Sequence, residues 1–138
     1  MTGATKSGPG FVLKLDVRSG VPVYRQIIDQ VLGGMAAGSL KSGDQLPTVR
    51  QLAVDLAINP NTVVRAYREL EIRGVLATQQ GTGTFITEQK PEKNELEHRR
   101  RVAQLAGELL AKAGAEGIKL QELLDYFHEF QKEQNGRT

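Results

Sequence analysis

The chain has 138 residues, which is enough for one domain and a small appendage but excludes two large domains. Hydrophobic residues make up 39% and charged residues 25%, which excludes wholesale disorder, and the net charge of +2 is only a weak indication of an acidic partner. The absence of cysteine excludes disulfides, thiol catalysis and cysteine-based metal sites, and is typical of the reducing cytoplasm.

Residues 1–20 are predicted to form a leader that is largely flexible. The first ten residues are small and polar and lack the apolar segment of a secretory signal. The sequence FVLKL at residues 11–15 is compatible with one short strand. No run in the chain approaches the roughly 20 apolar residues that a membrane helix needs, so we expect no membrane partner.

The first predicted helix spans residues 22–37. Pro22 suits a helix start, and apolar residues then recur at helical spacing up to Met35. Gly33 and Gly34 interrupt this pattern, and glycine costs a helix about 1 kcal/mol per residue relative to alanine. The pair therefore predicts that another element packs closely against this face of the helix.

Two further helices are predicted at residues 49–57 and 60–73, with a very short connection between them. Thr48 is a predicted N-cap, and Gln51, three residues later, completes a capping-box pattern. Asn59 is the predicted N-cap of the next helix, whose first residue is a proline. The two helices therefore form a predicted helix-turn-helix.

Two β-prone runs, residues 75–78 and 84–87, flank a glycine-containing turn and predict a hairpin. The charged, proline-containing segment 88–95 predicts a linker. Two amphipathic helices follow, at about 96–113 and 120–130. A pair of helices cannot bury both apolar stripes by itself, so we expect a homodimer whose contacts include Leu105, Leu109, Leu123, Phe127 and Phe130.

Three helices followed by a hairpin predict a winged helix-turn-helix, a mainly α fold with a small β-hairpin. We expect a DNA-binding domain at residues 21–88, followed by a linker and an α-helical dimerisation hairpin at 89–138. In this architecture the third helix enters the major groove amino end first, and here that end carries Asn61, Thr62 and Arg65. Asparagine suits adenine, threonine offers a hydroxyl or a methyl, and arginine suits guanine or phosphate.

Four segments of the chain are similar to a known family. VPVYRQIIDQ, GDQLPTVRQLA, NPNTVVRAYRELEIRGVL and QQGTGTFI resemble, in order and spacing, the DNA-binding domain of the GntR family of bacterial transcription regulators. The short helical tail resembles that of the YtrA subfamily. The resemblance implies a homodimeric regulator without enzymatic activity, commonly a repressor of transporter operons. Such a homodimer would bind double-stranded operator DNA that carries an inverted repeat.

The resemblance also assigns roles to residues. Arg50 matches the arginine of the leucine-proline-x-x-arginine motif, which reaches into the operator, and the turn of the hairpin matches the wing tip. Many members carry arginines where this chain has Pro60 and Val64, and whether Arg65 replaces either contact stays open. The predicted DNA contacts are Thr48, Arg50, Asn59, Asn61, Thr62, Arg65, Gln80, Gly81, Thr82 and Gly83.

Several residues also have simpler interpretations. Arg68 and Arg73 are interpreted as surface residues or as phosphate contacts of modest value. His98 and His128 are interpreted as structural or exposed, so no metal site, cofactor or catalytic residue is predicted. A winged helix that binds only a protein or a small ligand is the alternative function. A small-molecule effector that binds between the tail helices and the DNA-binding domain is compatible with the sequence.

Overall fold

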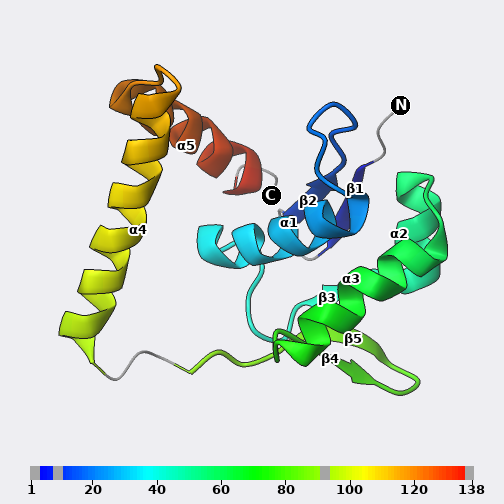
Figure 1. The fold of residues 1–138 in the computed structure, drawn as a ribbon. Helices are drawn as coiled ribbons and strands as arrows, with labels where there is room; N and C mark the ends of the chain where they lie inside the picture. The colour runs from blue at the N-terminus through cyan, green and yellow to red at the C-terminus, as the bar shows by residue number, and fades with distance from the viewer. Residues whose placement is uncertain (1–3, 8–10, 91–93, 136–138) are drawn as a thin grey trace. The chain divides into compact units, whose positions relative to one another are not determined.

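The computed structural model describes residues 4–7, 11–90 and 94–135. Its helices are α1 (Val23–Ala37), α2 (Val49–Leu56), α3 (Pro60–Ile72), α4 (Glu95–Ala115) and α5 (Leu120–Asn135) (Figure 1). Its strands are β1 (Ala4–Ser7), β2 (Phe11–Lys14), β3 (Gln45–Leu46), β4 (Leu76–Gln79) and β5 (Gly83–Ile86). These elements fall into two units: the first runs to Gln89 and includes the end of α5 from Glu133, and the second spans Lys90–Lys132.

The predicted fold class is confirmed. Helices α1, α2 and α3 and the two hairpin strands β4 and β5 lie within one residue of their predicted bounds. The two tail helices are also present, and α5 is longer than predicted because it continues to Asn135. The strands β1 and β3 were not predicted, since each is too short to display an alternating pattern.

The winged helix contains a three-stranded antiparallel sheet rather than a hairpin alone. The strand order is β3-β5-β4, and β3 pairs with β5 so that Gln45 lies opposite Phe85. On the other side of β5, Leu76 of β4 lies opposite Ile86. Since β3 leads directly into α2, the sheet connects the wing to the start of the helix-turn-helix (Figure 1).

The predicted strand at residues 11–15 is present as β2, which pairs with β1. In this strand Phe11 and Leu13 are buried in the core. A Cβ at Gly34 would lie 2.7 Å from a ring carbon of Phe11. The close packing predicted from the glycine pair is therefore confirmed at Gly34, whereas a Cβ at Gly33 would meet nothing within 4 Å.

A single apolar core holds the three helices of the first unit together. Its largest fully buried side chains come from β2 and from every helix of the winged helix: Phe11, Ile27, Ile28, Val31, Leu52, Leu56, Val63 and Leu70. Burying a side chain of this size contributes about 1.5–3 kcal/mol. The opposite faces of α2 and α3 take no part in this core and carry exposed side chains such as Arg50 and Arg68.

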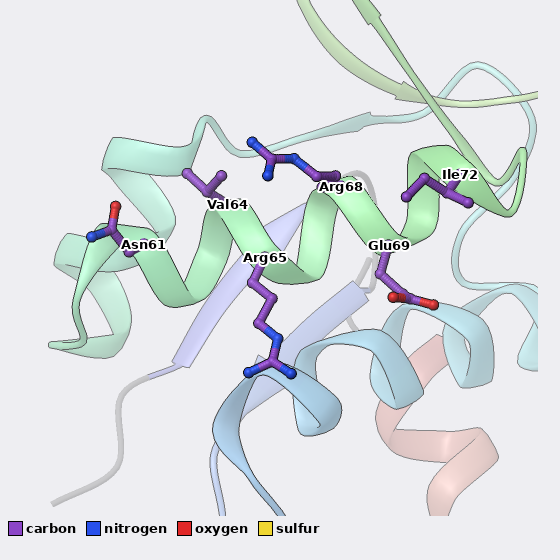
Figure 2. Close-up of a pocket in the computed structure, with 6 residues that line it drawn as sticks. All are labelled: Asn61, Val64, Arg65, Arg68, Glu69 and Ile72. Atoms are coloured by element: carbon purple, nitrogen blue, oxygen red, sulfur yellow. The ribbon is translucent and has the colours of Figure 1, made fainter.

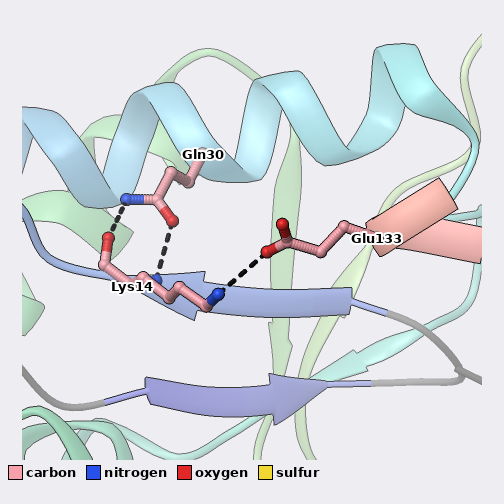
Figure 3. Close-up of polar contacts among 3 residues, drawn as sticks. All are labelled: Lys14, Gln30 and Glu133. Atoms are coloured by element: carbon pink, nitrogen blue, oxygen red, sulfur yellow. Dashed lines mark hydrogen bonds and ion pairs between the residues drawn. The ribbon is translucent and has the colours of Figure 1, made fainter. Parts of the chain in front are cut away.

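Polar contacts join β2 to α1 and to the end of α5 within the first unit (Figure 3). The Gln30 carboxamide accepts a hydrogen bond from the Lys14 backbone N–H at 2.8 Å and donates one to the Lys14 carbonyl. The Lys14 ammonium lies 2.9 Å from Glu133, and both side chains are about half exposed, so this ion pair adds little stability. The buried Ser39 hydroxyl donates to Gln134 at 2.7 Å.

Candidate nucleic-acid interface

The start of α2 places Arg50 at the surface. Thr48 is the N-cap, as predicted, and its hydroxyl accepts a hydrogen bond from the Gln51 backbone N–H at 3.0 Å. Among the described residues no hydrogen bond from the Thr48 backbone N–H to the Gln51 side chain is present, so the predicted capping box is only half formed; the Gln51 carboxamide donates to Asp55 at 2.7 Å. Arg50 lies in the first turn, is exposed, and makes no side-chain hydrogen bond or ion pair with the described residues.

The amino end of α3 begins directly after a tight turn. Ala57 adopts a left-handed conformation with φ of 56°, which lets the chain reverse between α2 and α3. Asn59 caps α3, and its side-chain oxygen accepts from the Asn61 backbone N–H at 2.8 Å. That oxygen is thus committed to the helix, whereas the exposed Asn61 side chain and the half-buried Thr62 project from its first turn.

Arg65 is held against α1. Its guanidinium carbon lies 3.7 Å from the centre of the Tyr24 ring, a cation–π contact. Figure 2 shows that Arg65 extends to one side of α3 and that Val64 and Arg68 extend to the other. The Tyr24 contact therefore competes with any contact between Arg65 and a base edge.

The outer face of α3 is a shallow pocket, which we call the α3 face. It is lined by Asn61, Val64, Arg65, Arg68, Glu69 and Ile72 (Figure 2). Arg73 forms an ion pair with Glu69 at 3.5 Å. Arg68 is exposed and forms no side-chain bond with the described residues, so the structure distinguishes two arginines that sequence reasoning had treated alike.

The wing tip is a three-residue turn between β4 and β5. Gly81 has φ of 84°, a conformation that glycine adopts readily, and the Thr82 backbone N–H donates to the Gln79 carbonyl at 2.9 Å. The exposed Gln80 lies in the same turn. The predicted wing residues Gln80, Gly81, Thr82 and Gly83 are thus together at the end of the hairpin.

Two residues that sequence reasoning did not single out fix these parts to one another. The Gln45 side chain donates to the Thr82 carbonyl at 3.0 Å and occupies the space beside Gly83, where a Cβ would lie 2.4 Å from its amide nitrogen. The Tyr67 hydroxyl donates to the Pro47 carbonyl at 2.7 Å, which ties α3 to the segment before α2. Burial raises the pKa of Tyr67, which keeps its phenol protonated as a donor.

The helical tail presents apolar side chains to the surface of the single chain. Leu105 is 71% exposed, Leu109 is 40% exposed and Phe127 is 49% exposed, whereas Leu123 and Phe130 are half-buried. Over the described residues, none of the helices is long and apolar enough to cross a membrane. The tail helices thus carry exposed apolar side chains together with many charged ones.

The chain is similar to known bacterial regulators. Residues 23–86 match the family described as "Bacterial regulatory proteins, gntR family". The chain is 34% identical over 125 residues to the HTH-type transcriptional repressor YtrA of Bacillus subtilis, covering 91% of this chain and 96% of that protein. The chain belongs to the GntR family. Its members are DNA-binding transcriptional regulators rather than enzymes, and the full-length similarity to a YtrA repressor supports the predicted subfamily.

Solved structures of GntR-family proteins agree with the fold. A GntR family transcriptional regulator from Listeria monocytogenes has a TM-score of 0.56 and 30% identity, covering 83% of this chain and 98% of that one. YtrA from Sulfolobus acidocaldarius has a TM-score of 0.51 and 34% identity, covering 67% of this chain and 97% of that one. The winged helix of this chain is therefore the DNA-binding domain typical of the family.

Proposed function

We propose that this GntR-family protein is a homodimeric repressor that binds an inverted-repeat operator. The observation that carries the proposal is that exposed, hydrogen-bonding side chains gather at the first turns of α2 and α3, with Arg50 and Asn61 foremost. These are the chemical groups that bind base edges and phosphates. Repression is the activity named for the relative YtrA of Bacillus subtilis.

In this proposal three parts of the winged helix contact DNA. Arg50 reaches into the groove from α2, and Asn61 and Thr62 contact bases or phosphates from α3. Asn59 and Thr48, whose side-chain oxygens cap the helices, contribute mainly by orienting them. The remaining proposed contacts are Arg65, Gln80, Gly81, Thr82 and Gly83, of which the last four form the wing tip.

The dimer is proposed from the exposed leucines and phenylalanines of α4 and α5. A second copy of the chain carries the same apolar stripes, and identical surfaces can cover one another about a twofold axis. The proposed partner of the tail is therefore a second copy of the chain. A twofold dimer then requires two half-sites of opposite orientation. By analogy with the subfamily, the regulated genes encode a transport system, and the protein acts in the cytoplasm where the DNA lies.

A mobility-shift titration of the full chain with its own upstream region tests the proposal. We expect one retained complex that weakens steeply as salt rises, because cationic side chains release counterions from phosphates. Footprinting of the complex should reveal two protected half-sites, and sedimentation of the free protein should give a dimer. A protein that binds only another protein or a small ligand would leave the duplex unretained at every salt concentration.

A further inference from the structure

The α3 face contains one apolar side chain near the amino end of the helix. Asn61, Val64 and Arg68 follow one another at three- and four-residue spacing, so they form a stripe on one side of α3 (Figure 2). Ile72 lies at the far end of the helix. Of the two apolar residues on the α3 face, Val64 therefore lies closer to the amino end of the helix. This is the end that is proposed to enter the major groove.

Two of the three charged residues on the α3 face are engaged elsewhere, which leaves part of Val64 exposed. The Arg65 guanidinium is turned toward Tyr24 on α1, and Glu69 is paired with Arg73. Arg68 lies on the same side of α3 as Val64 and forms no side-chain bond with the described residues. Val64 is itself half-buried, so its Cβ is anchored on the helix while part of its methyl surface faces outward.

The chemistry of valine limits what it can recognise in DNA. Valine has no hydrogen-bonding atom in its side chain, and its branched Cβ restricts it to few rotamers, so it presents a rigid apolar surface. In the major groove the one apolar group on a base edge is the C5 methyl of thymine. A valine on a groove-facing helix therefore favours thymine over the other three bases.

We propose that Val64 recognises the methyl group of a thymine in each operator half-site. The inference rests on the proposed function, because it requires α3 to lie in the major groove. Val64 follows Asn61 by three residues, close to one helical turn, so the two side chains project from neighbouring positions on the same side of α3. The thymine is thus near the base that Asn61 contacts.

Deoxyuridine tests the proposal because it differs from thymidine only by that methyl group. The native full-length chain is first used to select its preferred sites from duplexes with a randomised segment. Each thymine of the selected half-site is then replaced by deoxyuridine, one position at a time. We expect one position at which the replacement weakens binding by the native chain roughly threefold to tenfold, the effect of losing one methyl contact.

The same measurements on Val64→Ala complete a double-substitution cycle, in which the valine side chain and the thymine methyl group are removed singly and together. This variant should bind the thymine duplex more weakly than the native chain and should be insensitive to deoxyuridine at the same position. Val17→Ala is the matched control, because Val17 is an exposed valine that precedes α1 and lies outside the helix-turn-helix and the α3 face. Val64→Thr keeps the branched shape and one methyl, and thermal unfolding of both Val64 variants checks that they fold.

Two results would overturn the inference while leaving the proposed function intact. One is specific binding that is indifferent to deoxyuridine at every position. The other is a deoxyuridine effect that persists at full size in both folded Val64 variants. Failure of the native chain to select any common sequence would instead refute the proposed function, and the inference with it.

Discussion

Replacing Tyr67 with phenylalanine removes one oxygen atom and one hydrogen bond from the winged helix. The hydroxyl donates to the Pro47 carbonyl at 2.7 Å, and Pro47 lies two residues before the α2 helix that carries Arg50. The ring remains and no cavity forms, so the change isolates the link between α3 and this segment. Tyr67→Phe therefore tests whether the hydrogen bond stabilises the arrangement of the two helices.

The expected loss follows from the geometry. A typical protein hydrogen bond contributes about 0.5–1.5 kcal/mol, and a fully buried acceptor left unpaired costs more. Pro47 is half-buried, so water can replace the lost donor, and we expect a decrease of about 1 kcal/mol in the free energy of unfolding. In a domain of this size that corresponds to a fall in Tm of about 4–8 °C.

Chemical denaturation monitored by circular dichroism measures this loss at pH 7. Burial raises the pKa of Tyr67 above its ordinary value, so the folded protein binds the phenolic proton more tightly than the unfolded chain does. The stabilisation that follows from this tighter proton binding is complete below about pH 10, the ordinary pKa of tyrosine. Above that pH the free energy of unfolding decreases by up to about 1.4 kcal/mol per pH unit. Tyr67→Phe should lack this alkaline component.

Equal unfolding free energies for the native and Tyr67→Phe proteins at pH 7 would refute the structural role of the hydrogen bond. An unchanged alkaline slope would separately refute the effect of burial on the pKa of Tyr67. The affinity for operator DNA should fall less in Tyr67→Phe than in a variant that removes Arg50, since the tyrosine only orients the segment that leads to it.

Three further predictions concern the DNA contacts, the wing and the tail. Arg50→Ala should weaken operator binding by about 1–3 kcal/mol in a fluorescence titration, whereas Arg73→Ala, whose guanidinium is paired within α3, should have a smaller effect; equal losses would remove Arg50 from the site. Gln45→Glu keeps the side-chain size but loses the donor to the wing turn. In hydroxyl-radical footprinting the largest loss of protection should therefore be where the wing tip contacts DNA, which the family resemblance places over the minor groove. Undiminished protection there would contradict a positioning role. Leu109→Asp should sediment as a monomer. The control variant Val17→Asp, which changes an exposed valine of the first unit, should sediment as a dimer. A dimeric Leu109→Asp protein would contradict the proposed interface.

The local elements were predictable because short-range chemistry determines them. Helix α3 starts where Asn59 can cap and Pro60 can occupy the first position, and both signals are visible in the sequence. The wing turn needs a residue with positive φ, which Gly81 supplies. Such signals depend on neighbours within about four residues, so they survive in a single sequence without any knowledge of the tertiary fold.

Contacts between distant residues were not predictable in the same way. The Tyr24 ring meets Arg65 across two helices, and periodicity gives each helix a face without saying which side chain it meets. No strand was predicted at Gln45, because a two-residue strand has no pattern of its own. The four-residue spacing of Val64 and Arg68 places them on one side of α3, but spacing alone does not show that Arg65 turns away from this side toward Tyr24.

The six residues from Gln45 to Arg50 connect all three proposed DNA contacts. At one end the Gln45 amide holds the Thr82 carbonyl of the wing, and at the other end Arg50 projects from α2. Between them the Pro47 carbonyl accepts a hydrogen bond from the hydroxyl of Tyr67 on α3. Because one short segment is bonded to both the wing and α3, a displacement of either one is transmitted to Arg50. We therefore expect the wing and the two helices to bind DNA as a coupled unit, in which the energetic effects of single substitutions are not independent.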